Sequence, residues 1–429
     1  MPDQNPATPT GRAGAPASRV RDDPRGGAAI AVAIGVMNIA TYGFQIVAAR
    51  ALGPQQYGAL AAVMNLLLVI SVASLALQAT AARRIAAAPG DVAAVEDGVR
   101  RVTWRAALGL GAVLVLAAPL VNELLRLESV GTAVLVGLIA VPLTVMGGLA
   151  GTLQGERRWT SLALLYVAAG VPRLAVGSAL ILWRPEELTA VVGVLVGALA
   201  PVAVGVYALR HRLGGDHAPS DTDHGTRSLV RESLRNSQAL LAFFAVTNID
   251  VIIARNLLDD HDSGLYAGGL ILTKAVLFLP QFVVVLAFPS MSTGADRQRA
   301  LRLSLVLVAA LGAVGVLAAY LLSDVALIFV GGDDYAEVRG ELWLFAILGT
   351  LLSMIQLLVY ALLAREGGRA VLLLWLALAA LPVLAATLVG SVEGLLTVVL
   401  AVNAVLFVAL LGVVLLRGGH AAHAAADDD

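Results

Sequence analysis

Long apolar segments, separated by short polar stretches, recur along the chain from residue 28 to residue 416. Each segment is about 20 residues long, which is the length that an α-helix needs to cross the hydrocarbon core of a bilayer. Helices are expected because backbone groups in hydrocarbon need partners within the segment, and the sequence lacks the alternating pattern of a membrane barrel. The pattern predicts twelve spans, at residues 28–48, 58–79, 105–122, 130–153, 161–182, 189–209, 238–257, 264–289, 303–322, 341–363, 370–389 and 394–416.

The polar stretches indicate how the chain is divided. Residues 1–26 are rich in proline, glycine and arginine, and we expect a disordered cytoplasmic tail there and not a signal peptide. Residues 210–237 form the longest internal polar stretch and predict a cytoplasmic linker between two six-helix halves, 27–209 and 238–417. Residues 418–429 are expected to form a second cytoplasmic tail.

Composition supports an all-α, polytopic membrane protein. Hydrophobic residues make up 59% of the chain and charged residues only 14%, whereas a soluble domain carries about 25% charged residues. The sequence has no cysteine, and it has no phosphate-binding glycine loop, metal-ligand spacing or nucleophile elbow. We therefore expect no cofactor, no metal, no nucleic-acid partner and no enzymatic activity.

Arginine placement predicts the orientation. With a cytoplasmic N-terminus, the twelve spans put 22 arginines in or beside inner segments and five in outer segments. This agrees with the positive-inside rule and predicts that both termini are cytoplasmic. The five outer arginines are Arg50, Arg126, Arg184, Arg255 and Arg339.

An internal repeat is the next feature of the chain. The pattern A-R-x-L at residues 49–52 returns at residues 254–257, an offset of 205, and Pro172 and Pro382 are 210 apart. Chance matches are common in apolar sequence, but similar offsets at the same points in the span order favour two halves. Because six is even, both halves enter the membrane in the same direction, as parallel repeats do, and the substrate of such transporters lies between the halves.

The same residues carry a family resemblance. The chain resembles the polysaccharide-biosynthesis or oligosaccharide flippase family in four places. These are A-R-x-L-G-P-x-x-Y-G at Ala49 to Gly58, N-x-D-V-x-x-A-R-x-L at Asn248 to Leu257, G-x-Y-A at Gly264 to Ala267, and the proline-rich end of the eighth span. Its superfamily also contains the MATE antiporters and the lipid II flippases. The resemblance covers residues 28–416 and implies a MATE-like fold in a bacterial cytoplasmic membrane.

Three charged residues fall deep inside the spans. Counting 1.5 Å per residue, Asp250, Arg173 and Lys274 lie roughly 10, 14 and 15 Å below the outer edge. Buried ionisable groups are costly and are functional candidates. We expect Arg173 and Lys274 to bind an anionic head group such as a diphosphate, and Asp250 to be the ion-coupling site, for H⁺ or Na⁺. The alternative is a structural ion pair of Asp250 with Lys274 or with Arg255.

Three further residues are substrate-binding candidates. Gln45 falls opposite Asp250 under the 205 offset and carries an amide suited to sugar hydroxyls. Arg50 and Arg255 close the first and seventh spans at matched positions. The alternative functions are hydrogen bonds between helices for Gln45 and interfacial snorkelling for both arginines.

Prolines and glycines mark two other places in the spans. Pro280 and Pro289 either break the eighth span and free carbonyls for a hinge or an ion, or are tolerated without function. Gly147, Gly151 and Gly155 form a GxxxGxxxG ridge, for which we expect close helix packing.

The expected function is a flippase for a polyprenyl-diphosphate-linked oligosaccharide or related glycolipid, driven by an ion gradient or the membrane potential. The alternative is a MATE-like drug/cation antiporter, and less favoured classes are a membrane glycosyltransferase or polymerase and a scaffold. Two buried cations against one carboxylate favour an anionic ligand. Expected partners are the lipid-linked oligosaccharide, the coupling ion, membrane lipids, and glycosyltransferases or a polymerase of the same pathway.

Overall fold

The computed structural model describes residues 24–87, 92–210, 238–277, 297–363 and 368–426. Within these ranges the regular elements are all helical, which confirms the expected all-α fold. The elements are α1 (Pro24–Ala87), α2 (Val92–Leu116), α3 (Ala118–Leu125), α4 (Val130–Gly155), α5 (Trp159–Pro172), the π-helix η1 (Arg173–Gly177), α6 (Ser178–Trp183), α7 (Glu187–Leu209), α9 (Ile249–Leu257), α10 (Asp260–Leu277), α12 (Arg297–Leu321), α13 (Ser323–Val330), the 3₁₀ helix η3 (Asp333–Glu341), α14 (Leu342–Leu363), α15 (Gly368–Leu388) and α16 (Val392–Ala426).

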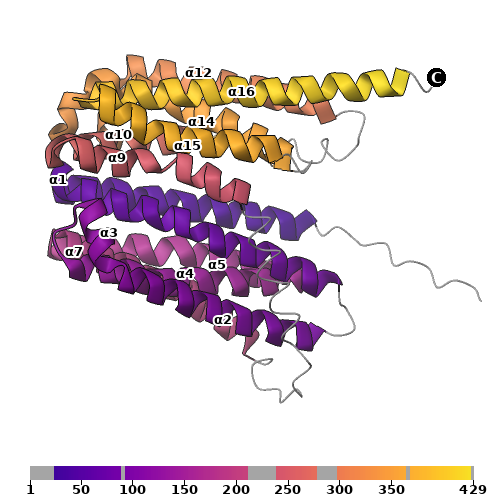
Figure 1. The fold of residues 1–429 in the computed structure, drawn as a ribbon. Helices are drawn as coiled ribbons and strands as arrows, with labels where there is room; N and C mark the ends of the chain where they lie inside the picture. The colour runs from indigo at the N-terminus through magenta and orange to yellow at the C-terminus, as the bar shows by residue number, and fades with distance from the viewer. Residues whose placement is uncertain (1–23, 88–91, 211–237, 278–296, 364–367, 427–429) are drawn as a thin grey trace, which may run out of the picture.

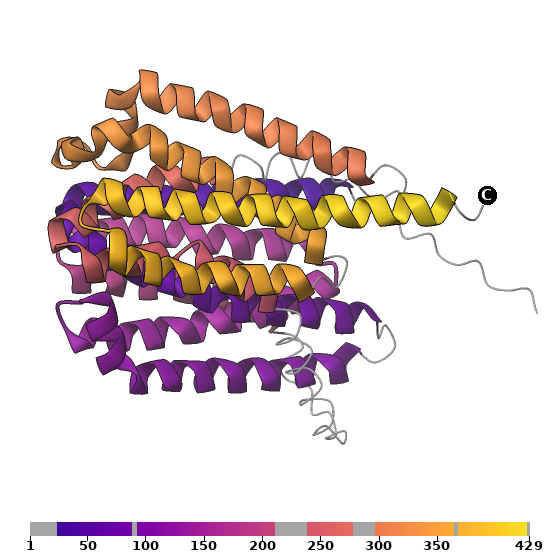
Figure 2. The same ribbon diagram turned by 45° about the horizontal axis from the view of Figure 1, so that its top comes forward.

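The helices form two bundles that lie side by side (Figures 1 and 2). We call α1 to α7 the N-terminal bundle and α9 to α16 the C-terminal bundle. Contacts between the bundles run from α1 to α9, α10 and η3, and from α3 to α9. The long helices run roughly along one direction in both views, as expected for membrane spans.

Helix α1 holds the first two predicted spans. A straight helix of its 64 residues would be about 96 Å long, three times the hydrocarbon thickness. The helix breaks at Gly53, whose φ of 69° and ψ of 172° are not helical, and Pro54 follows directly. A positive φ is readily adopted only by glycine, so the G-P pair sets where the first span ends.

The two parts of α1 run in opposite directions. The first part packs parallel to α5, and the second part packs parallel to α4. Because α4 and α5 are joined by only three residues and lie antiparallel, the two parts of α1 are antiparallel as well. Figure 1 shows both parts of α1 in the N-terminal bundle. Four close pairs carry this conclusion: Gly170 with Met37, Gly177 with Phe44, Gly147 with Ser74, and Gly155 with Ile85.

The described residues hold nine helices long and apolar enough to cross a membrane, or ten if the bent pair α2 and α3 is one span. The angle in that pair is 65°. If the bent pair is counted as one span, two places account for the difference between ten and the predicted twelve. Helix α1 counts once but holds two predicted spans, and the predicted span 264–289 continues past α10 beyond the described residues. The number twelve stays a prediction, and so do the boundaries of the two halves.

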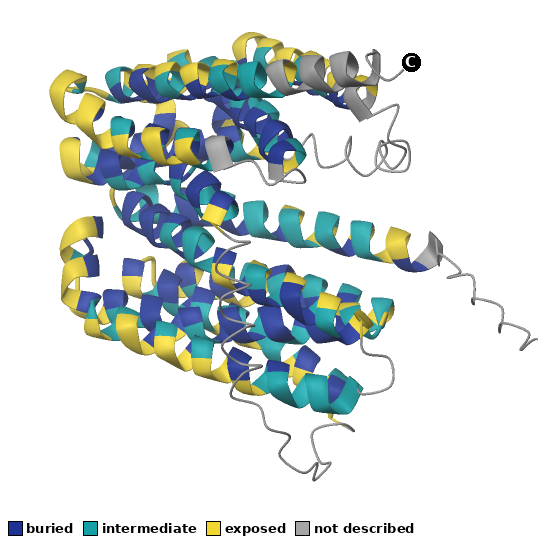
Figure 3. Ribbon diagram, turned by 45° about the vertical axis from the view of Figure 1, so that its right-hand side comes forward, coloured by how far each residue is buried: buried dark blue, intermediate teal, exposed yellow. Residues whose placement is uncertain are grey.

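Figure 3 shows exposed positions on outer helices of both bundles, and many of the exposed residues are large and apolar. Leu116, Trp183 and Val405 are 82%, 75% and 71% exposed. A surface of this kind is unfavourable in water but suits contact with lipid tails. The arrangement therefore fits a bundle pair immersed in a bilayer.

The GxxxGxxxG ridge packs as expected. A Cβ on Gly147 would collide with the backbone of Ser74, and one on Gly151 would lie within 3 Å of the backbone of Gln78. The ridge lets α4 lie against the second part of α1 at a distance that larger residues do not allow. Pro280 and Pro289 lie outside the described residues.

We expect Gly147→Ala to lower the midpoint of thermal unfolding of the detergent-purified protein. The added methyl overpacks the contact between α4 and α1, at a cost of about 1–3 kcal/mol. Gly109→Ala is the matched control, because a Cβ there meets no atom within 4 Å and alanine favours the helix. Equal midpoints for the two variants would contradict the packing role of the ridge.

Candidate functional site

The two bundles meet most closely between the second part of α1 and α10. Gly264 lies against the backbone of Pro54, and a Cβ on Gly58 would be 3.1 Å from the Cα of Gly264. From there both helices run inward to a contact between Asn65 and Lys274. The contact therefore extends about 15 Å along α10, at 1.5 Å per residue.

Lys274 is held across this contact by two amides. Its ammonium group donates to Oδ1 of Asn65 on α1, and it lies 3.4 Å from Oδ1 of Asn248. Asn65 donates its NH₂ to the carbonyl of Ala61 and Asn248 donates to that of Phe244, each at 2.7 Å. Each amide thus uses its donor on its own helix and turns its acceptor oxygen toward the ammonium group.

Asp250 lies in the first turn of α9 and is only 3% exposed. Its Oδ2 accepts the hydroxyl of Tyr266 at 2.9 Å, and its Oδ1 accepts the amide N–H of Val251 at 3.0 Å. The N-terminus of a helix also favours a negative charge. The carboxylate is therefore stabilised by uncharged donors on α9 and α10.

The alternative interpretation, a structural ion pair of Asp250 with Lys274 or Arg255, is not formed among the described residues. No nitrogen of Lys274 or Arg255 lies within salt-bridge distance of Asp250, although Lys274 and Asp250 attract each other at longer range. Arg255 pairs instead with Asp260, at 3.1 Å. The reason is that amides and a phenol lie closer to the two buried charges than the charges lie to each other.

Gln45 lines a small cavity between the bundles, together with Tyr57, Met64, Asn65, Leu270 and Lys274. Its free volume is about 10 Å³, roughly the room that one water molecule needs. This cavity beside Lys274 has no room for a larger ligand in this conformation.

Arg173 lies inside the N-terminal bundle and does not line this cavity. It starts η1, donates to the hydroxyl of Thr41 on α1, and packs against Gly197 of α7. Its Nε has no hydrogen-bond partner among the described residues. Arg173 therefore does not share the small cavity beside Lys274, and it is a partly buried cation held by a hydroxyl instead of a carboxylate.

Arg50 and Arg255 lie at matched ends of spans, and neither lines the cavity around Lys274. Arg50 donates to the carbonyl of Ile328 at 2.5 Å, and Arg255 donates to the carbonyl of Leu125 at 3.1 Å. Both therefore contact backbone of the opposite bundle.

The sequence reasoning did not find Tyr266. A signal was present, because Tyr266 and Lys274 are eight residues apart and so lie on one face of α10. Asn65 and Asn248 are polar residues within predicted spans, but their sequence positions do not show that both turn toward one lysine. That contact joins residues 209 positions apart.

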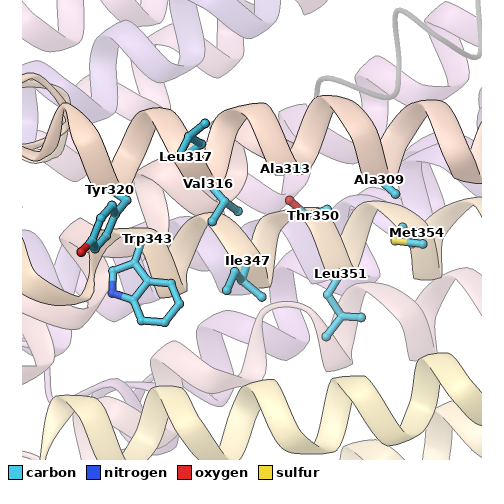
Figure 4. Close-up of a pocket in the computed structure, with 10 residues that line it drawn as sticks. All are labelled: Ala309, Ala313, Val316, Leu317, Tyr320, Trp343, Ile347, Thr350, Leu351 and Met354. Carbon is cyan, nitrogen blue, oxygen red and sulfur yellow. The ribbon is translucent and has the colours of Figure 1, made fainter.

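A second hollow lies between α12 and α14 and measures about 580 Å³ (Figure 4). Tyr320 and Trp343 form one end of it, with an edge-to-face contact at 6.5 Å between ring centroids. No charged residue is among those that line it, so it suits a hydrocarbon chain and not a charged head group. The lining residues are Ala309, Ala313, Val316, Leu317, Tyr320, Trp343, Ile347, Thr350, Leu351 and Met354.

Comparison with known proteins identifies the family and the fold. Residues 25–295 match the model of a family described as polysaccharide biosynthesis protein. No protein of curated function matches the sequence.

Solved structures with the same fold are MATE transporters. An inward-facing multidrug resistance MATE family transporter of the MOP superfamily is 15% identical, with a TM-score of 0.71 over 92% of this chain and 97% of that one. An outward-facing MATE family transporter of the MOP superfamily is 15% identical, with a TM-score of 0.59 over 92% of this chain and 96% of that one. A MATE structure in a bent conformation gives 0.60 at 13% identity, over 94% and 96%. The MATE-like fold class is thereby confirmed.

We expect Asn65→Ala and Lys274→Met to be coupled in a double-mutant cycle. Each single change removes the same contact. The second change should therefore lower the free energy of unfolding by about 1–3 kcal/mol less in the presence of the first change than in the wild type. The measurement is the free energy of unfolding in SDS titrations of each variant.

Asn403→Ala is the control for this cycle. Asn403 is also buried and donates to its own helix, at the carbonyl of Val399, but it makes no hydrogen bond to Lys274. Its combination with Lys274→Met should be additive. Additivity in the Asn65 cycle as well would contradict the contact.

Proposed function

The chain belongs to the polysaccharide biosynthesis protein family, and from this premise we propose that it is a flippase for a polyprenyl-diphosphate-linked oligosaccharide or a related glycolipid. Family and fold support a membrane transporter and not an enzyme. The proposed task is to carry the glycolipid across a bacterial cytoplasmic membrane for cell-surface polysaccharide assembly. Glycosyltransferases or a polymerase of the same pathway are the proposed partners.

One observation carries this proposal: Lys274 is a partly buried cation at the contact between the bundles, and among the described residues its hydrogen bonds go to neutral amides. A salt-bridged lysine would have to give up a carboxylate before it bound an anion. Lys274 only exchanges amide oxygens for phosphate oxygens, which form stronger, charge-assisted hydrogen bonds. Separation of the bundles would free it for a diphosphate.

Arg173 and Gln45 extend the proposed substrate site. Arg173 is a second, partly buried cation, and its Nε, which has no partner among the described residues, adds a donor for phosphate oxygens. Its forked guanidinium suits bidentate phosphate binding, whereas Lys274 acts as a point charge. Gln45 lies beside Lys274 and offers an amide to sugar hydroxyls.

Asp250 is the proposed coupling residue, for H⁺ or Na⁺. Its carboxylate attracts Lys274 from beyond salt-bridge distance. A cation bound at Asp250 would cancel this attraction and leave the charge of Lys274 available to the diphosphate. Coupling-ion binding and anion binding would then favour each other, as linked sites require.

The proposed transport mechanism is alternating access between the two bundles. They meet at the end that carries the Gly53 break, α3, the junction of α9 and α10, and η3, and we call this the closed end. The arginine distribution predicts that the closed end is outside and both termini are cytoplasmic. Substrate would then enter from the cytoplasmic side.

The second candidate is a MATE-like drug/cation antiporter. The observation in its favour is that the similar solved structures include multidrug resistance transporters. A cationic substrate needs a site with net negative charge, and Asp250 supplies one carboxylate. Lys274 and Arg173 oppose such a substrate, so the anionic ligand is preferred.

The test is transport of a fluorescent polyprenyl-diphosphate oligosaccharide in proteoliposomes with an imposed ion gradient. We expect Lys274→Ala to lower the flipping rate at least tenfold, because a desolvated contact between a cation and a phosphate is lost. Asp250→Asn should abolish the dependence on the gradient. Asp324→Asn and Arg184→Ala are the matched controls, because both residues lie in exposed ion pairs.

Two results would contradict the proposal. Flipping that is untouched by both changes would make Asp250 and Lys274 structural. Absence of flipping in the wild type, with export of cationic dyes instead, would leave the antiporter.

A further inference from the structure

The short helix α3 ends with carbonyls that receive no hydrogen bond from the helix itself. Arg126 follows it in the left-handed conformation, with φ 48° and ψ 56°. The amide N–H of Arg126 caps Glu123, and that of Leu127 caps Asn122. The carbonyls of Leu124, Leu125 and Arg126 point onward and need donors from elsewhere.

Those donors come from the other bundle. Arg255 of α9 donates through Nε to the carbonyl of Leu125 at 3.1 Å and through Nη2 to the carbonyl of Arg126. The neighbouring Asn256 donates to the carbonyl of Leu124 at 2.7 Å. Arg255 is only 3% exposed, so its own two bonds are largely shielded from water, whereas the bond of Asn256 is exposed. A positive charge at a helix C-terminus is favourable in addition.

The contact is reciprocal. Arg126 donates to the carbonyl of Asn256 at 3.1 Å and to that of Leu258 at 3.3 Å, and these lie at the end of α9. The end of each helix is thus capped by an arginine of the other bundle. Asp260 and Ser263 hold the remaining side of Arg255, at 3.1 and 3.2 Å.

The internal repeat places a second, smaller contact of the same kind. Helix α13 begins 205 positions after α3 and is also eight residues long. Arg50, the repeat partner of Arg255, donates to the carbonyl of Ile328 in α13. Nearby, the hydroxyl of Tyr335 donates to the carbonyl of Ala49 at 3.2 Å. The same motif therefore reaches the matching short helix of the opposite bundle in both halves.

The five outer arginines divide into two groups. Arg50, Arg126 and Arg255 bridge the bundles. Arg184 pairs with Glu186 at 3.2 Å, and Arg339 pairs with Asp324 at 3.1 Å, each within its own bundle and in an exposed pair.

We propose that Arg255, Arg126, Asn256 and Arg50 form a latch that holds the two bundles together at the closed end, and that the two A-R-x-L motifs serve gating rather than substrate binding. The latch consists of arginine and asparagine side chains that cap helix carbonyls across the contact. When it opens, water can solvate the arginines, so no charge stays buried without a partner. Its existence is independent of the substrate. Only the direction in which it gates transport rests on the function proposed above.

The two halves of the latch are unequal. The position that matches Arg126 under the 205 offset is Gly331, so α13 has no reciprocal arginine. Arg50 is also exposed, whereas Arg255 is buried. Water competes for the bond of Arg50, so the pair of Arg255 and Arg126 should carry most of the closing free energy.

The experiment measures the distance across the closed end by electron–electron double resonance in nanodiscs. Spin labels are attached at Glu123→Cys in the N-terminal bundle and Ala336→Cys in the C-terminal bundle, since both residues are exposed. The chain has no native cysteine, so these two labels are the only ones. The readout is the ratio of long to short distances, which needs neither substrate nor transport.

Arg126→Gly and Arg255→Ala are the main variants. Each removes two bonds across the contact, and each should raise the ratio of open to closed molecules about tenfold. Glycine suits a φ of 48° better than arginine, so Arg126→Gly keeps the end of α3 intact and decides the matter if Arg255→Ala does not fold. Arg50→Ala should give a smaller rise. The matched controls, Arg184→Ala and Arg339→Ala, should leave the ratio unchanged.

Distances in Arg126→Gly and Arg255→Ala that match the two controls would overturn the latch. Failure of the flippase proposal gives a different result. In that case no variant flips the glycolipid, while the distances still lengthen in the latch variants and in no control.

Discussion

Every backbone N–H and C=O that lies in hydrocarbon needs a partner inside the protein, and this constraint shapes both the helices and the contact between the bundles. Within a span the helix satisfies its own groups. Where a helix ends or breaks, at Gly53, after α3 and after α9, carbonyls are left over. Arginines of the opposite bundle cap them after α3 and α9. The same requirement that makes the spans helical thus supplies the groups through which the two bundles hold each other.

The charged residues farther from the closed end have partners of a different kind. At the closed end the cations meet backbone carbonyls, and Arg255 also pairs with the carboxylate of Asp260. Deeper, Lys274 and Arg173 are held by amides and a hydroxyl. Neutral partners compensate a buried charge only in part, which makes these sites receptive to an anion. The cations proposed for gating thus lie at the closed end, apart from the cations proposed for substrate binding.

Much of the fold follows from local sequence because its cause is local. Apolar segments of about 20 residues predict helices, and the ridge at Gly147, Gly151 and Gly155 predicts close packing, since small residues permit it wherever a neighbouring helix lies. Of the site, the sequence predicts candidate ionisable residues, because burial of charge is costly in any fold. It does not reveal that Tyr266 holds Asp250, or that Arg173 lies apart from the cavity of Lys274.

The sequence by itself determined an all-helical membrane protein and predicted a repeat that puts Arg50 and Arg255 at matched positions. It also predicted Asp250, Lys274 and Arg173 as buried charges, of which Asp250 is buried and the other two are partly exposed. Only the tertiary structure decided the partners: Asn65 for Lys274, the end of α3 for Arg255, and Thr41 for Arg173. The physical reason is the range of each effect. Hydrophobicity and helix geometry act over a few residues, whereas the contact of Arg255 with Leu125 joins positions 130 apart and exists only when two bundles pack.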